Sequence, residues 1–175
     1  MGRFSGSSGS RWALRPRQSM AGQLFDDILT RHPFLVGMTP DQLTVLAGCA
    51  SERRYAEAEY VTREGQPAGE LFLIQQGQVT VETRVGKRGN LRLETLNAGD
   101  VLGWSWLMEP YEWLFDSRAL TPLEVVVLDG ECLREHCGAD HELGYQLLLR
   151  IARVIEHRLQ ATRLQLLDVH QPKRT

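Results

Sequence analysis

The chain has 175 residues, of which 42% are hydrophobic and 24% charged, the composition of a globular protein rather than of a disordered chain. Twenty Lys and Arg residues against 22 Asp and Glu give a net charge of −2, so no strong nucleic-acid-binding field is expected. No stretch approaches the roughly 18 apolar residues that span a membrane. Three cysteines are too few for a disulfide framework. We therefore expect one cytoplasmic domain without a membrane or DNA partner.

The first 19 residues differ in composition from the rest of the chain. They contain four arginines, no acidic residue and a Gly/Ser run, but no apolar stretch of the kind that a secretory signal needs. We interpret residues 1–19 as a disordered tail or a segment added for expression. Without them, 16 basic residues face 22 acidic ones, a net charge of −6 that further disfavours nucleic acid.

Helical signals precede the first predicted strand. Apolar residues at helical spacing predict a helix within residues 22–37. A second helix is predicted to start at Thr39, with Pro40 at its first position and Gln42 placed to complete a capping box. Cys49 ends this helix and is expected to be a small, reduced core residue.

Between Arg54 and Leu128 the hydrophobic period changes to two, and glycine-containing turns separate short apolar segments. The predicted strands contain Val61, Leu71–Ile74, Val79–Val81, Leu91–Leu96 and Glu124–Leu128. Short strands with frequent glycine turns are typical of an antiparallel sandwich or barrel. Asp129 is then placed to cap a short helix through Glu131–His136. We predict an α+β fold, an antiparallel β jelly roll with N-terminal helices and a long C-terminal helix.

Residues 139–168 are predicted to form that long helix. An apolar series with alternating spacings of four and three indicates a dimer seam. The seam residues are Leu148, Ala152, Ile155, Leu159, Thr162 and Leu166. The alternative is a helix packed only on its own barrel. The expected organisation is a helical and jelly-roll sensor domain at 20–138, a dimerisation helix at 139–168 and a tail at 169–175.

Two stretches resemble the cyclic-nucleotide-binding domain of the catabolite-activator (Crp/Fnr-like) class. Glu64–Ala68 followed by Leu71–Val81 is similar to that family's "EGxxAxxxYxIxxGxVxV" stretch. Asn97–Gly103 is similar to the "xxGDxFG" entrance of its phosphate-binding cassette. The resemblance covers roughly residues 25–168. It implies the jelly roll with its long helix and a regulatory, non-catalytic function.

The cassette departs from the family at the positions where the resemblance implies nucleotide contacts. Trp104 follows Gly103 where a ribose-binding Glu is implied. Trp113, Leu114 and Phe115 occupy the positions of the phosphate-binding Arg, the hydroxyl residue and the small residue. A charge-assisted hydrogen bond is worth about 1.5–3 kcal/mol, so its loss alone costs roughly 10- to 100-fold in affinity. We therefore expect that cAMP and cGMP are not bound in the usual way.

Aromatic side chains replace the missing polar groups, and three interpretations stay open. The tryptophans fill the pocket and leave a ligand-free scaffold or protein-interaction module; or they stack on a flat or apolar small molecule; or a cyclic nucleotide binds in an altered geometry. Arg118 is the only cation of the stretch and is expected on the opposite face of its strand. The candidate ligand-binding residues are Gly99, Asp100, Gly103, Trp104, Ser105, Trp106, Trp113, Leu114, Phe115 and Arg118.

Other chemistries are disfavoured. A metal-dependent jelly-roll enzyme needs histidines on its strands, and none of the five lies between residues 54 and 130. The segment Cys132–His141 holds two cysteines and two histidines, but not at zinc-knuckle spacing, so no metal site and no cofactor are predicted. Seven residues after Asp168 are too few for a helix-turn-helix. We predict a non-catalytic sensor that acts through a homodimer or an unidentified protein partner.

Overall fold

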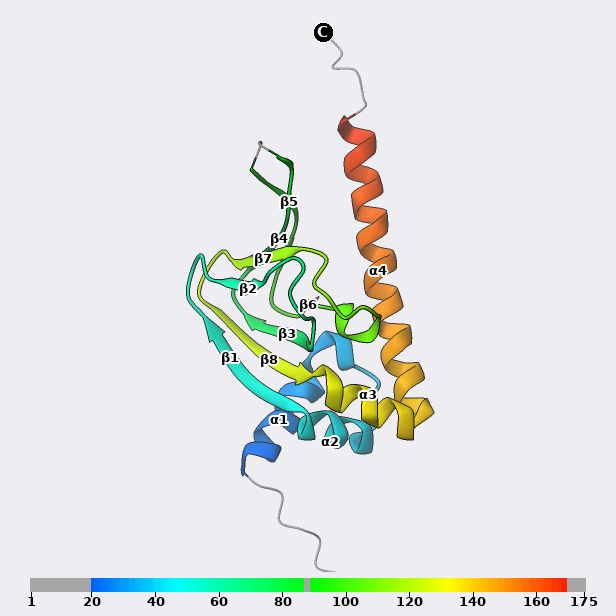
Figure 1. Ribbon diagram of the computed structural model, residues 1–175. Helices are drawn as coiled ribbons and strands as arrows, with labels where there is room; N and C mark the ends of the chain where they lie inside the picture. Colours follow the sequence, from blue (N-terminus) through cyan, green and yellow to red (C-terminus); the bar gives the residue numbers. More distant parts are fainter. Residues whose placement is uncertain (1–19, 87–88, 170–175) are drawn as a thin grey trace, which may run out of the picture.

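The structure is a computed structural model that describes residues 20–86 and 89–169, so the predicted tail at 1–19 and most of that at 169–175 lie outside the described residues (Figure 1). Its strands are β1 (Ala50–Tyr55), β2 (Tyr60–Thr62), β3 (Glu70–Gln76), β4 (Val79–Arg84), β5 (Asn90–Leu96), β6 (Val101–Leu102), β7 (Asp116–Ala119) and β8 (Leu123–Asp129). Its helices are α1 (Met20–Arg31), α2 (Pro40–Gly48), α3 (Gly130–Ala139) and α4 (His141–Val169), with the 3-10 turns η1 (Pro33–Leu35) and η3 (Ser105–Leu107).

The strands form two four-stranded antiparallel sheets, which confirms the predicted jelly roll. One sheet has the order β1-β8-β3-β6 and the other the order β2-β7-β4-β5. Strand β8 carries the continuous apolar run Val125–Leu128 because its sheet is covered on both faces. Val125 and Val127 belong to the core between the two sheets, whereas Val126 and Leu128 belong to the core under the helices.

The helices α1, α2, α3 and the first turns of α4 gather against the outer face of the β1-β8-β3-β6 sheet (Figure 1). Leu29 of α1, Leu46 of α2 and Leu133 of α3 are fully buried in this helical core. Among the described residues, the β2-β7-β4-β5 sheet has no such helical layer, and α4 alone of the described helices extends far enough to run beside it (Figure 1). The molecule therefore has a helical end and a long helix flanking the barrel.

The two predicted helix starts are confirmed by their hydrogen bonds. The Thr39 hydroxyl accepts from the Gln42 amide at 3.2 Å, and the Gln42 side-chain oxygen accepts from the Thr39 amide at 3.1 Å. This reciprocal pair is the predicted capping box. Asp129 likewise caps α3 by accepting from the Cys132 amide at 2.8 Å.

The predicted helix within residues 22–37 is wrong at its C-terminal end. Helix α1 ends at Arg31, and the chain continues into the 3-10 turn η1, with Pro33 at its first position. Proline has no amide hydrogen and disfavours helical geometry in the residue before it, so the α-helix stops there.

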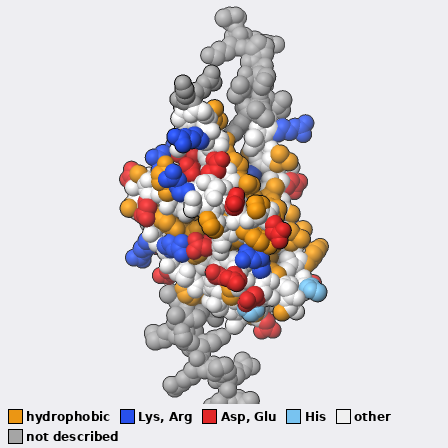
Figure 2. Space-filling model, in the orientation of Figure 1, with side chains coloured by type: hydrophobic (Ala, Val, Ile, Leu, Met, Phe, Trp, Pro, Cys, Tyr) orange, Lys and Arg blue, Asp and Glu red, His pale blue; other side chains and the backbone are white. Residues whose placement is uncertain are grey.

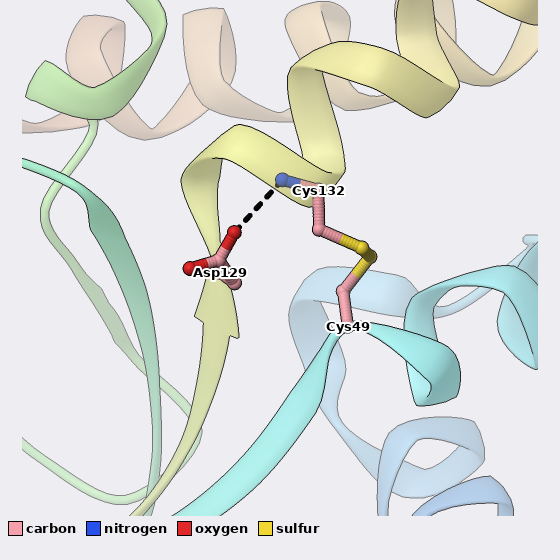
Figure 3. Close-up of a disulfide and its surroundings, with 3 residues drawn as sticks. All are labelled: Cys49, Asp129 and Cys132. Atoms are coloured by element: carbon pink, nitrogen blue, oxygen red, sulfur yellow. Dashed lines mark hydrogen bonds between the residues drawn. A yellow bond between two sulfur atoms is a disulfide. The ribbon is translucent and has the colours of Figure 1, made fainter.

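Cys49 is a core residue as expected, but the expectation that it is reduced is wrong. Cys49 is bonded to Cys132 in a disulfide, although 83 residues separate them in the sequence (Figure 3). The fold places the C-terminal end of α2 beside the first turn of α3, which brings the two side chains together. Of the three cysteines, Cys137 keeps a free thiol, and burial raises its pKa.

Helix α4 packs on its own domain with one face and exposes an apolar series on another. Leu147 is 1% exposed, whereas Leu148 is 53% and Leu159 is 67% exposed. Of the predicted seam, Ala152 and Thr162 are also exposed, while Ile155 packs partly against the domain. The side chain of Leu166 lies outside the described residues. None of the helices in the described ranges has both the length and the apolarity that a bilayer-spanning helix needs.

Two neighbouring leucines test this placement of α4. Leu147→Ala removes buried apolar contacts and should lower the free energy of unfolding by about 2–5 kcal/mol. Leu148→Ala is the matched control and should change it by less than about 0.5 kcal/mol in the monomer. Chemical denaturation at low protein concentration measures both values. Equal losses for the two variants would contradict the orientation of the helix.

Candidate functional site

A cavity of about 260 Å³ lies between the jelly roll and α4. This volume is close to the lower end of the roughly 300–1,000 Å³ range of small-molecule sites. The barrel contributes Thr62, Val81, Leu93, Glu94, Leu102, Gly103, Trp104, Ser105, Trp113, Leu114, Phe115 and Ser117 to its lining, and α4 contributes Ile155, Arg158, Leu159 and Thr162. The predicted cassette and the predicted dimer helix therefore face the same space.

Trp113 closes the inner end of the cassette. Gly103 has a φ of 91°, and a Cβ placed on it would come within 2.8 Å of the Trp113 ring, so only glycine fits at this close approach. The Trp113 ring also packs against Phe72, with 6.0 Å between the ring centroids. Its backbone is held on both sides, because its amide donates to the Gln66 carbonyl and its carbonyl accepts from the Gly65 amide. Trp113 is thus a fixed part of the cavity wall.

The other two tryptophans of the cassette have different environments. Trp106 is fully buried in the helical core, and its carbonyl accepts a hydrogen bond from Arg134 at 2.6 Å. It does not line the cavity. Trp104 lines the cavity and is only partly buried. The three tryptophans therefore divide between core packing and the cavity wall.

Arg158 brings a partly buried cation from α4 to the cavity. Its guanidinium lies over the Trp104 ring, 4.6 Å from the ring centroid, and donates to the Val101 carbonyl. Its Nε lies 3.2 Å from the carboxylate of Glu94 on β5. Burial lowers the pKa of Arg158 and raises the pKa of Glu94, while the attraction between the two charges opposes both shifts. The pair is the charged feature of an otherwise mainly apolar space.

Two hydroxyl groups on strands β2 and β7 add polar groups to the side of the cavity that the sheet forms. The side-chain oxygens of Thr62 on β2 and Ser117 on β7 lie 2.6 Å apart. The Thr62 hydroxyl also lies 3.2 Å from the Phe115 carbonyl oxygen, to which it can donate. Both residues are buried and line the cavity. A ligand would therefore meet hydroxyls on the sheet side and a guanidinium–carboxylate pair on the helix side.

The predicted candidate residues are only partly brought together. Gly103, Trp104, Ser105, Trp113, Leu114 and Phe115 line the cavity. Gly99 and Asp100 line a second, more polar cavity of about 450 Å³ on the far side of the Arg158–Glu94 pair. Arg118 lines neither; it donates to the Glu82 carboxylate at 3.1 Å, in keeping with the opposite face expected for it.

The part of the site that α4 and β5 supply was not predicted from the sequence. Arg158 is not among the predicted candidate residues, although it lies on the face of α4 that packs against the barrel. Its spacing from Leu147, Ile151 and Val154 follows a helical stripe that the structure shows to be buried or partly buried. An arginine on such a stripe was the available signal for a cation that packs against the barrel. Glu94 on β5 had no comparable signal.

Known proteins share this fold and sequence pattern. The chain is 25% identical over 144 residues to the CRP-like cAMP-activated global transcriptional regulator of Mycobacterium tuberculosis. The aligned residues cover 82% of the chain and 62% of the regulator. It is 28% identical over 109 residues to the cGMP-dependent protein kinase egl-4 of Caenorhabditis briggsae, 62% of the chain but 14% of the kinase. The chain thus spans less than two thirds of the length of either relative.

Solved structures agree on the fold. A cyclic nucleotide-binding domain from Methylobacillus flagellatus superposes with a TM-score of 0.72 at 17% identity, covering 88% of this chain and 86% of that one. A regulatory subunit of a cAMP-independent protein kinase A from Trypanosoma cruzi bound to guanosine superposes with a TM-score of 0.58 at 22% identity, covering 75% and 51%. Residues 52–140 match the family described as the cyclic nucleotide-binding domain. The chain belongs to the cyclic nucleotide-binding domain family.

Proposed function

We propose that the chain is a non-catalytic regulatory domain that senses a small, mainly apolar ligand in the cavity between its cassette and α4. The observation that carries this proposal is that α4 forms one wall of the cavity and is held there by Arg158. A ligand in the cavity would contact the helix directly. Its binding energy could then shift the position of α4 relative to the barrel.

The chemistry of the walls favours a flat apolar molecule with one acidic group. Trp104, Trp113 and Phe115 offer aromatic surface for stacking. Arg158 offers a guanidinium whose carboxylate partner inside the protein is Glu94. A ligand carboxylate can take the place of Glu94 and form a charge-assisted hydrogen bond with the same guanidinium. The Thr62 and Ser117 hydroxyls are available to a further polar group.

The same walls disfavour a cyclic nucleotide bound in the usual way. Trp113 occupies the position that the family resemblance assigns to the phosphate-binding arginine, and its ring packs directly on Gly103. Trp104 takes the place of the ribose-binding glutamate. That the Trypanosoma cruzi neighbour is bound to guanosine, a nucleoside without a phosphate, supports the idea that this fold accommodates other ligands.

Thermal unfolding with naphthoate tests the proposal. A ligand at about 100 times its Kd adds roughly 2.7 kcal/mol of stability, which corresponds to a rise in Tm of about 5–10 °C at this size. We expect such a rise with naphthoate, a smaller one with the uncharged naphthamide, and none with cAMP or cGMP. Arg158→Gln should remove the difference between naphthoate and naphthamide. Arg153→Gln, which changes an exposed arginine of α4, is the matched control and should keep it.

Three outcomes would contradict the proposal. A rise in Tm with cAMP or cGMP alone would make the domain a cyclic-nucleotide receptor despite its altered cassette. No change with any of these compounds would favour the ligand-free scaffold that docks on another protein. Equal responses of Arg158→Gln and Arg153→Gln would remove Arg158 from the site.

We further propose that a second copy of the chain packs on the exposed face of α4. Leu148 and Ala152 follow the heptad spacing and are exposed along that face. Helix α4 also runs beside and beyond the sheets, which leaves its outer face accessible to a partner helix (Figure 1). On the face shown in Figure 2, basic and acidic side chains are interspersed rather than gathered by sign, so an apolar contact agrees better with this surface than a strongly charged partner does.

Light scattering coupled to gel filtration measures this association. The wild-type chain should elute with twice the monomer mass of 19.8 kDa. Leu148→Glu combined with Ala152→Glu should give the monomer, because charges on the seam repel and cannot be buried. Leu91→Glu, an exposed leucine on β5, is the control and should stay dimeric. A wild-type monomer, or a dimer unaffected by the seam variant, would contradict the proposal.

A further inference from the structure

Three side chains with metal-binding chemistry converge at the helical end of the fold, away from both cavities. One ligand atom each from Cys49, Cys132 and His136 lies within 4.8 Å of the other two. None of the three lines either of the cavities described above. In the sequence, Cys132 and His136 lie close to Cys137 and His141. The fold instead supplies Cys49 from the C-terminal end of α2.

The backbone around the two cysteines is held by one residue. The Asp129 amide donates to the Cys49 carbonyl at 3.0 Å, and the Asp129 carboxylate accepts from the Cys132 amide at 2.8 Å (Figure 3). Cys49 is further fixed as the C-cap of α2, where its amide donates to the Leu46 carbonyl. These bonds do not involve the sulfur atoms. The two cysteines should therefore stay near each other when the bond between their sulfurs is reduced.

His136 completes the donor set from the same helix as Cys132. Residues four apart lie one turn apart on one helix face, a spacing that lets two side chains chelate a single ion. The imidazole of His136 is exposed, Cys132 is partly buried and Cys49 is buried. The ion would thus be reached from solvent on the His136 side. Two thiolates and an imidazole suit Zn²⁺, with water in the fourth position.

We propose that the reduced chain binds one Zn²⁺ through the sulfurs of Cys49 and Cys132 and the imidazole of His136, and that the disulfide is the oxidised, metal-free form of the same site. A dithiol such as dithiothreitol gives two electrons and two protons to the disulfide; the products are two cysteine thiols and the cyclic disulfide of the reductant. Zn²⁺ then displaces one proton from each thiol. Two protons pass to the buffer, and the two thiolates balance the charge of the ion.

The test uses the full chain, reduced with dithiothreitol that is then removed under nitrogen. Zn²⁺ is titrated in competition with a chromophoric chelator, and Co²⁺ is added in a parallel sample because thiolate ligation of Co²⁺ gives an absorption band. We expect one Zn²⁺ per chain and a thiolate–cobalt band. The disulfide form should show neither.

Variants separate the metal site from a simple disulfide. Loss of an outer-shell partner alone costs about 10- to 100-fold in metal affinity, so His136→Ala and Cys132→Ser should each cost at least that much. His136→Ala changes an exposed side chain, so it should fold, and after oxidation it should still form the Cys49–Cys132 disulfide, with Cys137 as its remaining thiol.

The controls are the two residues that the sequence groups with the site but the fold leaves out. The Cys137→Ser and His141→Ala variants should bind Zn²⁺ as the wild type does. That result would exclude Zn²⁺ binding by the Cys137 thiol or the His141 imidazole. A reduced wild type that does not bind Zn²⁺ would overturn the proposal and leave a structural disulfide. Unchanged affinity in His136→Ala would overturn it as well.

Discussion

The contact between Arg158 and the barrel is the interaction on which the candidate site depends. One guanidinium contacts a backbone carbonyl at Val101, a carboxylate at Glu94 and the ring of Trp104. A buried charge is costly unless it is paired and hydrogen-bonded, so these partners fix where α4 can lie. Because Arg158, Glu94 and Trp104 also line the cavity, the position of the helix and the shape of the cavity are set together. A ligand that changes one must change the other.

The cassette resembles its family in sequence up to Gly103 and departs from it at the positions where the resemblance implies nucleotide contacts. Gly103 retains a left-handed conformation that no other residue fits, because the Trp113 ring and the Glu70 carbonyl crowd the position of a Cβ. The tryptophan that crowds it stands where the resemblance implies a phosphate-binding arginine. The backbone at Gly103 and the Trp113 ring therefore pack as one unit. The cation of the site is Arg158 of α4.

Much of the fold could be predicted from local sequence signals, whereas pairings between residues far apart in the sequence could not. The capping box at Thr39 and the cap at Asp129 each join residues three apart, so both could be predicted from the local sequence. The strands follow from alternation and glycine turns. The disulfide joins residues 83 apart in the sequence and depends on how α2 meets α3, which no local pattern records.

The candidate site was predictable only where it is continuous in the sequence. Six of the predicted cassette residues, which lie between Gly103 and Phe115, line the cavity, whereas Trp106 packs in the helical core. Arg158 and Glu94 reach the cavity through tertiary packing of α4 and β5, so the aromatic cluster alone could not reveal the charged pair. The two halves of the site meet only in the folded chain.

The indole N–H resonances of an isotope-labelled sample test the central claim most directly. Trp104 and Trp113 line the cavity, whereas Trp106 is buried in the helical core and serves as an internal reference. On addition of naphthoate, the Trp104 resonance and the side-chain Nε–H of Arg158 should shift while that of Trp106 stays in place, and cAMP should shift none of them. Shifts of Trp104 and Trp113 with cAMP but not with naphthoate would contradict the account.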